Sequence, residues 1–221
     1  MYKPITIPEL ILPWDSYSTN EYFLGWALSD GCITDGDGPR FKIELKYCDR
    51  EILYKWCDYL ETDRKRVKTA TRIKFGKPYK YVYLHIRSKE YCDYLKSYKI
   101  VPRKSLKAKV HDSLRNSPDF WRAMLEGDGC LYWKNKYPCV KMTGSYDVCK
   151  SFRNYIIGWR TGMPPLSTRK NIISKHDNIY QISYSGQAAL NIVRDLYREA
   201  PIVLSRKFKI YLEFIKGEKN V

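Results

Sequence analysis

The sequence predicts an α+β protein made of two similar halves, each with the element order αββαββα. Two short stretches resemble each other and end in Asp-Gly-Cys: FLGWALSDGC at 23–32 and FWRAMLEGDGC at 120–130. Their aspartates lie 98 positions apart in a chain of 221 residues, which indicates a duplicated domain and not a solenoid. After each stretch, segments with strand and helix periodicity follow in the same order.

Both repeated stretches carry the signals of helices. Ser18 and Glu21 have the spacing of a capping box at the start of the first helix. Ser117, followed by Pro118 and Asp119, offers the second helix an N-cap, a proline at its first position and an early acid. Near the end of each stretch is a glycine suited to stop the helix: Gly31 and Gly129.

The rest of the first half alternates between strand and helix patterns. A short strand is expected at 32–34, and residues 40–47 alternate between apolar and charged side chains, as in a half-buried antiparallel strand. The further elements of this half are expected as a helix at 50–60, a hairpin at 66–75 and 79–87 joined by residues 76–78, and a helix at 89–98.

The second half repeats this order and adds one helix. Its elements are expected as strands at 130–133 and 138–143, a helix at 146–159, a hairpin at 166–174 and 178–185, and helices at 187–198 and 205–215. The last helix pairs with one expected at 103–114, because Arg103-Lys104 resembles Arg206-Lys207. We therefore divide the chain into three parts: 1–98, the connection 99–117, and 118–221.

Composition indicates the class of partner. Lys and Arg number 40 against 24 Asp and Glu, a net charge of +16, and such an excess favours polyanions, with nucleic acid first. Apolar runs are too short for a membrane span, and the N-terminal residues lack a signal-peptide core. Seven cysteines, odd in number and without a CxxC, read as reduced packing residues. These features predict an intracellular protein that is not secreted and binds no membrane.

The repeated helices should pack closely against each other. Each carries two small residues four positions apart, hence on one face: Gly25 and Ser29, and Ala123 and Gly127. Small residues at this spacing let two helix backbones approach. If the helices meet through these faces, Asp30 and Asp128 lie side by side at their C-terminal ends.

Two carboxylates at two helix C-termini repel each other and face the negative ends of both helix dipoles. A structural role would not require this arrangement, whereas Mg²⁺ would resolve it through carboxylate and carbonyl oxygens. We therefore predict a divalent-metal site that hydrolyses phosphodiesters, with these ligands: Asp30, Asp128, Ser29 and Gly127. One Asp-Gly pair alone would be read as a helix end, but two in matched contexts favour a site.

The stretches resemble the motifs of LAGLIDADG homing endonucleases of the single-chain type with two motifs. Residues 25–31 and 123–129 fall on the last seven positions of the nine-residue signature. The resemblance implies two four-stranded antiparallel sheets that form a DNA-binding saddle, cleavage of both strands across the minor groove, and metal binding by Asp30 and Asp128. Leu28 stands where the signature has its first aspartate and Glu126 holds the matching place, and we assign metal ligation to neither.

Basic residues near the metals are less well defined by the sequence. Lys46, at the end of the charged strand, is the candidate in the first half, and its counterpart lies near Thr143. Lys104 and Lys207 are the candidates from the connection and the final helix. Each lysine is equally compatible with a phosphate contact or a solvated surface position.

The polar sheet faces should bind DNA, with arginine, glutamine and glutamate able to address bases in the major groove. The candidates are Arg40, Lys42, Glu44, Lys46, Arg72, Lys74, Tyr81, Tyr83, His85, Arg87, Lys141, Thr143, Arg169, Lys170, Gln181 and Ser183.

The function that these features favour is a monomeric, Mg²⁺-dependent endonuclease that cuts double-stranded DNA at a long asymmetric site. One alternative is an RNA maturase, a splicing cofactor that binds its own intron RNA on the same scaffold and needs no metal site. Another is a DNA-binding regulator without cleavage, which would have lost one or both aspartates. Intein splicing is disfavoured, because the chain lacks splice-junction residues.

Overall fold

The computed structural model describes residues 15–35, 38–104, 106–158 and 173–218. Both halves run α-β-β-α-β-β-α, so the predicted α+β class and duplicated order are confirmed. The first half contains α1 (Asp15–Ser29), β1 (Gly31–Thr34), β2 (Arg40–Lys46), α2 (Arg50–Tyr59), β3 (Lys68–Lys74), β4 (Lys77–Ile86) and α3 (Lys89–Ser97). The second contains α4 (Pro118–Gly127), β5 (Cys130–Lys134), β6 (Tyr137–Gly144), α5 (Tyr146–Gly158), β7 (Ser174–His176), β8 (Ile179–Ser185), α6 (Gln187–Tyr197) and α7 (Ser205–Glu218).

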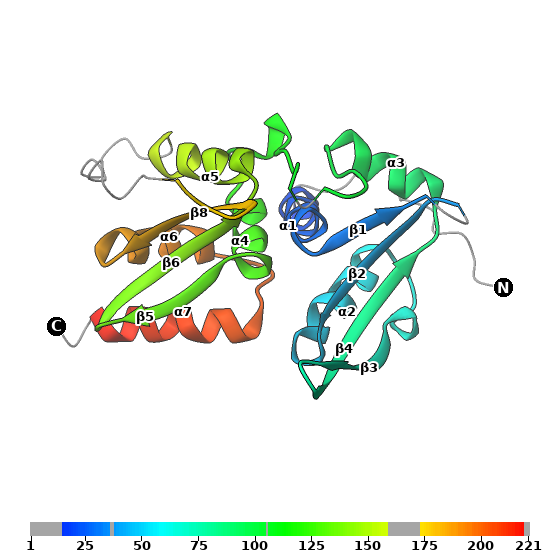
Figure 1. The fold of residues 1–221 in the computed structure, drawn as a ribbon, viewed down its shortest axis with the longest axis horizontal. Helices are drawn as coiled ribbons and strands as arrows, with labels where there is room; N and C mark the ends of the chain where they lie inside the picture. Colours follow the sequence, from blue (N-terminus) through cyan, green and yellow to red (C-terminus); the bar gives the residue numbers. More distant parts are fainter. Residues whose placement is uncertain (1–14, 36–37, 105, 159–172, 219–221) are drawn as a thin grey trace.

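Each half forms one antiparallel sheet of four strands. The strand orders are β1-β2-β4-β3 and β5-β6-β8-β7, so the same topology occurs twice. The two sheets lie on either side of the central pair α1 and α4 (Figure 1). This arrangement places the C-terminal ends of the repeated helices between the two sheets.

One face of each sheet packs on helices and leaves the other face polar. Alternation in β2 buries Phe41, Ile43 and Leu45, and β4 buries Val82, Leu84 and Ile86 against α2 and α3. In the second half, the buried residues of β6 and β8 pack on α5 and α6. No helix within the described residues has the length and apolar character that crossing a membrane would need.

The predicted entry into the first helix was wrong, whereas the entry into α4 was right. Helix α1 already includes Asp15, so Ser18 lies inside it and caps nothing. Glu21 instead accepts a hydrogen bond of 2.6 Å from the hydroxyl of Ser117, which is the N-cap of α4. The acid of the expected capping box therefore links one motif helix to the start of the other.

The connection between the halves also differs from its prediction. No α-helix occupies 103–114 in the part of this segment that the structure describes, and only a 3-10 turn is present at Asp112–Leu114. Arg103 has a φ of 54°, which is incompatible with a continuing helix. The segment instead crosses between the halves and buries Ala108 and Val110.

The structure corrects two predictions about turns, namely the reason for the glycines after the motif helices and the residues of the first hairpin turn. Gly31 and Gly129 follow the helices, but neither has a positive φ. A Cβ on Gly31 would lie 2.5 Å from the Ala27 carbonyl oxygen, and one on Gly129 would lie 2.6 Å from that of Leu125, so close packing requires these glycines. In the first hairpin the turn residues are 75 and 76, because Pro78 already pairs with Ile73 in the ladder.

Parts of the second half lie outside the described residues. Most of the strand predicted at 166–174 falls there, and the described β7 covers Ser174–His176. Residue 159, the last residue of the helix predicted at 146–159, also lies outside the described residues.

Candidate active site

The site begins with the close packing of α1 and α4. A Cβ on Gly25 would lie 2.6 Å from the Phe120 carbonyl oxygen and 2.7 Å from the Ala123 Cβ, both closer than van der Waals contact. A Cβ on Gly127 would lie 2.7 Å from the Ser29 Cβ. The helix backbones therefore meet through the four small residues of the motif faces.

This packing brings Asp30 and Asp128 to one place between the sheets. Both residues are exposed to solvent by their accessible surface area. The protein atoms around them nevertheless remove much of the water that would otherwise solvate their carboxylates. Burial raises the pKa of Asp30 to about 6, and the charge of Asp128 contributes to this shift. Burial also raises the pKa of Asp128. The positive charges of two lysines act in the opposite direction on both.

These lysines are Lys104 and Lys207, the two site lysines. The Nζ of Lys104 donates a hydrogen bond of 3.0 Å to the Ser29 carbonyl oxygen. The Nζ of Lys207 donates to the carbonyl oxygens of Leu125, at 2.6 Å, and Gly129, at 2.7 Å. Their side chains are buried, and burial lowers the pKa of both, that of Lys207 to about 8. Each motif helix thus has a cation at its negative end.

The donor atoms at this place fit a divalent cation of the Mg²⁺ type. Two carboxylates with raised pKa values favour a neutralising cation, and no hydrogen bond to the Asp128 carboxylate is present among the described residues. No cluster of three or more His, Cys, Asp or Glu side chains occurs in the described parts of the chain, so further ligands would be water, backbone or substrate oxygens. Mg²⁺ commonly binds through one or two carboxylates with such partners.

The remaining predicted ligands have other contacts. The Ser29 carbonyl oxygen accepts the hydrogen bond of Lys104, and the Ser29 hydroxyl donates to the Asp30 carboxylate at 3.4 Å. Gly127 lies against Ser29 and Asp30, where a side chain would not fit. The geometry therefore gives Gly127 a steric role beside the aspartates.

A cavity of about 200 Å³ opens beside Asp128 on the side of the second half. Its polar lining comes from Ser29, Asp128, Thr143 and Ser145, and its apolar lining includes Met124. The volume holds several water molecules at about 30 Å³ each. Thr143, expected near the metals as the counterpart of Lys46, thus reaches the neighbourhood of Asp128.

No contact between Lys46 and either aspartate is present among the described residues. This lysine lies exposed at the end of β2, and among the described residues it makes no hydrogen bond or ion pair. The strand pattern predicted its face correctly, and its role beside the aspartates stays a prediction.

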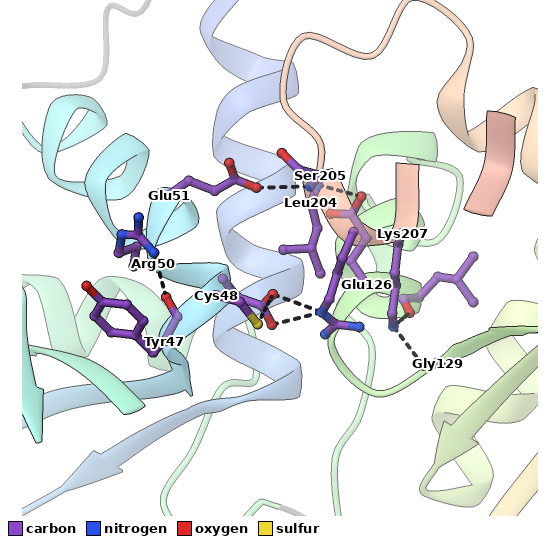
Figure 2. A network of polar contacts seen from close by, with 12 residues as sticks. Tyr47, Cys48, Arg50, Glu51, Glu126, Gly129, Leu204, Ser205 and Lys207 are labelled. Carbon is purple, nitrogen blue, oxygen red and sulfur yellow. Dashed lines mark hydrogen bonds and ion pairs between the residues drawn. The ribbon is translucent and has the colours of Figure 1, made fainter. Parts of the chain in front are cut away.

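The sequence did not reveal the role of Glu126. Its buried carboxylate accepts a hydrogen bond of 2.5 Å from the Tyr22 hydroxyl. It also accepts one of 2.9 Å from the Leu204 backbone N–H (Figure 2). Burial raises its pKa. Through these two hydrogen bonds Glu126, which lies on α4, connects α1 with the start of α7. One feature of the sequence could have indicated this role: Glu126 is charged, whereas the matching position of the first repeat is the apolar Leu28, which is buried.

The polar face of the first sheet carries an ordered group of aromatic and charged side chains. The Arg72 guanidinium pairs with Glu44 at 3.1 Å and lies 4.6 Å from the ring centroid of Tyr81. Rings of neighbouring residues continue along β4, with centroid distances of 6.1 Å from Tyr81 to Tyr83 and 4.8 Å from Tyr83 to His85. Glu44 also binds Lys42 at 2.5 Å. The predicted residues of this half on β2 and β4 share this face: Arg40, Lys42, Glu44, Lys46, Tyr81, Tyr83 and His85.

In its described residues, the second sheet presents a smaller and less charged face than the first. Lys141 pairs with Ser183, and Thr143 pairs with Gln181, so these four predicted residues lie together.

The other predicted DNA-binding residues are spread over both halves. In the first half, Lys74 lies on β3 with its ammonium 5.3 Å from the Tyr79 ring, and Arg87 is exposed just beyond the end of β4. The predicted Arg169 and Lys170 lie outside the described residues. The two sheets therefore offer unlike surfaces.

Comparison with solved structures identifies the fold. No protein-family model matches the sequence, and no curated protein is similar to it in sequence. The structure of the homing endonuclease I-WcaI bound to its DNA recognition sequence is similar over 91% of this chain and 95% of that chain, with a TM-score of 0.60 and 13% identity. The LAGLIDADG homing endonuclease I-GzeII in complex with its DNA target is similar over 90% and 89%, with a TM-score of 0.50 and 12% identity.

A third similar structure is the N-terminal LAGLIDADG domain of DUF199/WhiA. It matches over 86% of this chain and 89% of that chain, with a TM-score of 0.51 and 11% identity. At such low identities the likeness establishes the fold, which is the single-chain, duplicated LAGLIDADG fold. The motifs that suggested this resemblance in the sequence thus lie on the helices expected of them.

Asp30→Asn is expected to stabilise the metal-free protein near pH 7. The Asp30 pKa rises from 3.8 to about 6 on folding, so the folded state retains a proton that the unfolded chain releases between these values. Wild-type stability should therefore fall as pH rises from about 4 to about 6 and stay lower above that. The melting temperature of the variant should exceed that of the wild type at pH 7, with the gain vanishing near pH 4.

Asp58→Asn is the matched control for this comparison. The Arg64 guanidinium lowers the pKa of Asp58, so the same substitution there should bring no gain at pH 7. If both aspartates hold the predicted ion, added Mg²⁺ should raise the melting temperature of the wild type but not of Asp30→Asn, because such an ion would bind only the folded site. Equal stability of wild type and Asp30→Asn at pH 7 would contradict the burial of the Asp30 charge and its repulsion by Asp128.

Proposed function

We propose that this protein is a site-specific, Mg²⁺-dependent endonuclease that makes double-strand cuts in DNA at a long asymmetric target. The observation that carries the proposal is the pair Asp30 and Asp128, placed side by side by closely packed helices and flanked by two buried lysines. A purely structural helix pair would gain nothing from two desolvated carboxylates at its negative ends.

The side chains of the site have distinct roles in this function. Asp30 and Asp128 would hold the divalent cation, which when bound supplies water activation and stabilisation of the leaving oxygen. Lys104 and Lys207 place positive charge beside the aspartates, where it favours the approach of the scissile phosphates and stabilises charge that develops on them. The cavity beside Asp128 provides room for water next to one carboxylate.

The sheets would hold the DNA. Basic side chains across both polar faces and the net charge of +16 favour the phosphate backbone. The polar side chains of β2, β4, β6 and β8 would contact base edges in the major groove. A single chain with two unlike faces would act as a monomer on an asymmetric site, inside the cell where its DNA lies.

A library of plasmids with randomised inserts tests this function directly. With Mg²⁺, the protein should linearise a small subset that shares one sequence, and EDTA should prevent this. Sequencing of the ends should give a consensus without two-fold symmetry. A perfectly palindromic consensus would instead indicate a homodimer that reads one half-site per chain.

Two alternative functions predict other outcomes on the same fold. A cleavage-dead DNA-binding regulator would select a specific sequence from the library and leave it uncut, whether or not Mg²⁺ is present. An RNA maturase would promote splicing of its own intron RNA, and this activity would persist in Asp30→Asn and Asp128→Asn.

Arg72→Ala is expected to relax base preference within one half of the target. Glu44 and the Tyr81 ring hold the Arg72 guanidinium, so its donors are positioned before DNA arrives. A bidentate arginine contact discriminates between bases by about 1–3 kcal/mol. Selection of bound sites from random DNA should therefore show weakened preference at one or two positions for Arg72→Ala.

Arg198→Ala provides the control, because Arg198 is exposed at the end of α6, on the helical layer. It should leave the consensus unchanged. Uniformly weaker binding by Arg72→Ala at all positions, with an unaltered consensus, would reassign Arg72 to phosphate contact.

A further inference from the structure

Four consecutive residues at the start of α7 each make a contact outside their own helix. Figure 2 shows Leu204, Ser205 and Lys207 facing Glu126, Glu51 and Gly129. The contacts are Leu204 N–H to Glu126 at 2.9 Å, Ser205 N–H to Glu51 at 2.9 Å, Arg206 Nε to the Asp49 carboxylate at 2.8 and 3.0 Å, and Lys207 Nζ to the Leu125 and Gly129 carbonyl oxygens. Two of these partners, Asp49 and Glu51, belong to the first half of the chain.

The segment that carries the other site lysine is held in a similar way. Lys104 bonds to the Ser29 carbonyl oxygen at the end of α1. Further along the connection, the Val110 N–H donates to the Asp147 carboxylate at 2.8 Å, and the Ala108 carbonyl oxygen accepts from the Ser145 hydroxyl at 2.6 Å. Ser145 and Asp147 lie at the start of α5, in the second half.

The two sets of contacts form a crossed pattern. Lys104, in the connection, bonds to the end of α1, and Lys207 bonds to carbonyl oxygens at the end of α4. In each case an aspartate at the start of a helix in the other half holds the segment around the lysine. The connection has to cross between the halves near residue 110, so its contact with α5 follows from connectivity. Helix α7 lies wholly in the second half, so nothing in the chain path requires it to reach Asp49.

We propose that Asp49 and Asp147 are positioning residues. Each holds, from one half of the protein, the segment whose site lysine bonds to the motif helix of the other half. Asp49 thereby positions Lys207, and Asp147 positions Lys104. The two aspartates act on separate segments, so the two lysines are positioned independently of each other. The consequence for cleavage rests on the proposed endonuclease function, but the consequence for the lysines does not.

Amine labelling of the free protein, without DNA or metal, tests the positioning directly. Lys104 and Lys207 are only 6% and 4% exposed, so an amine-reactive reagent should modify them slowly. In Asp49→Ala, peptide mass spectrometry should show Lys207 labelled about tenfold faster and Lys104 unchanged. In Asp147→Ala the result should be reversed. Tenfold corresponds to about 1.4 kcal/mol, as expected for one lost charged hydrogen bond.

Two controls separate positioning from general loosening. Asp58→Ala removes an acid that binds Arg64 away from both segments, and it should change neither lysine. The exposed Lys209 on α7 reports the reagent rate within every variant. If either aspartate variant fails to fold by circular dichroism, Arg206→Ala replaces Asp49→Ala, and Ser145→Ala replaces Asp147→Ala. Faster labelling of both lysines together, or of neither, would overturn the proposal.

The rates at which the two DNA strands of the selected target are cut, measured separately, then test whether lysine positioning affects the reaction. Asp49→Ala and Asp147→Ala should each slow the cutting of one strand, and the slowed strands should differ, so that nicked circles accumulate. Equal slowing of both strands in both variants, despite selective labelling, would count against independent use of the lysines. A wild-type protein that never cuts would reject the endonuclease function and leave the labelling result standing.

Discussion

Asp30→Asn and Asp128→Asn are each expected to abolish double-strand cleavage while leaving specific DNA binding largely intact. Asparagine preserves the shape of the side chain but removes the charge that would hold the metal. Most side chains that would contact DNA belong to the sheets and are unchanged in both variants, so target affinity measured in EDTA should change little. Single-turnover cleavage and gel-shift titration measure the two quantities separately.

Asp58→Asn is again a suitable control, because Asp58 is exposed and pairs only with Arg64 among the described residues. It should cut at the wild-type rate. If Asp30→Asn or Asp128→Asn cut both DNA strands at the wild-type rate, the assignment of that residue to the metal site would be wrong.

Gly25→Leu and Ala123→Leu are expected to destabilise the whole protein. Even one methyl group on Gly25 would approach the Phe120 carbonyl oxygen to 2.6 Å, and the two helices cannot separate without exposing their buried faces. Overpacking of this kind costs about 1–3 kcal/mol, and a backbone contact places the effect at the upper end. Urea unfolding should show a lower midpoint for both variants.

Gly158 offers a matched control, since a Cβ there would meet no atom of the described residues within 4 Å and its φ is not in the left-handed region. Gly158→Leu should leave the midpoint close to that of the wild type. Unchanged midpoints for Gly25→Leu and Ala123→Leu would mean that α1 and α4 do not pack through this face in solution.

Local patterns in the sequence were sufficient for the elements and for the centre of the site. Alternation along residues 40–46 and 81–86 predicted both buried faces, since strand periodicity depends only on neighbouring residues. The spacing of Gly25, Ser29, Ala123 and Gly127 predicted the helix contact because close packing requires small side chains there. The placement of Asp30 and Asp128 followed from that contact.

Features that depend on contacts distant in the sequence could not be predicted. Glu21 had the spacing of a capping residue but bonds to Ser117, which is 96 positions away. Basic residues at 103–114 suggested a helix, whereas burial of Lys104 against α1 and the crossing to α5 favour an extended path. Likewise, no local signal indicates that Arg206 reaches Asp49, 157 positions away.

The positions of the two cuts on the selected target test the central claim most directly. Adjacent carboxylates can act only on phosphates that lie close together, and the closest phosphates of opposite strands face each other across the minor groove, about 6 Å wide. End-labelled target strands, resolved on a sequencing gel, should therefore show one cut per strand, offset by a few base pairs across the minor groove. Cuts separated by about ten base pairs, one helical turn, would contradict a single shared centre at Asp30 and Asp128.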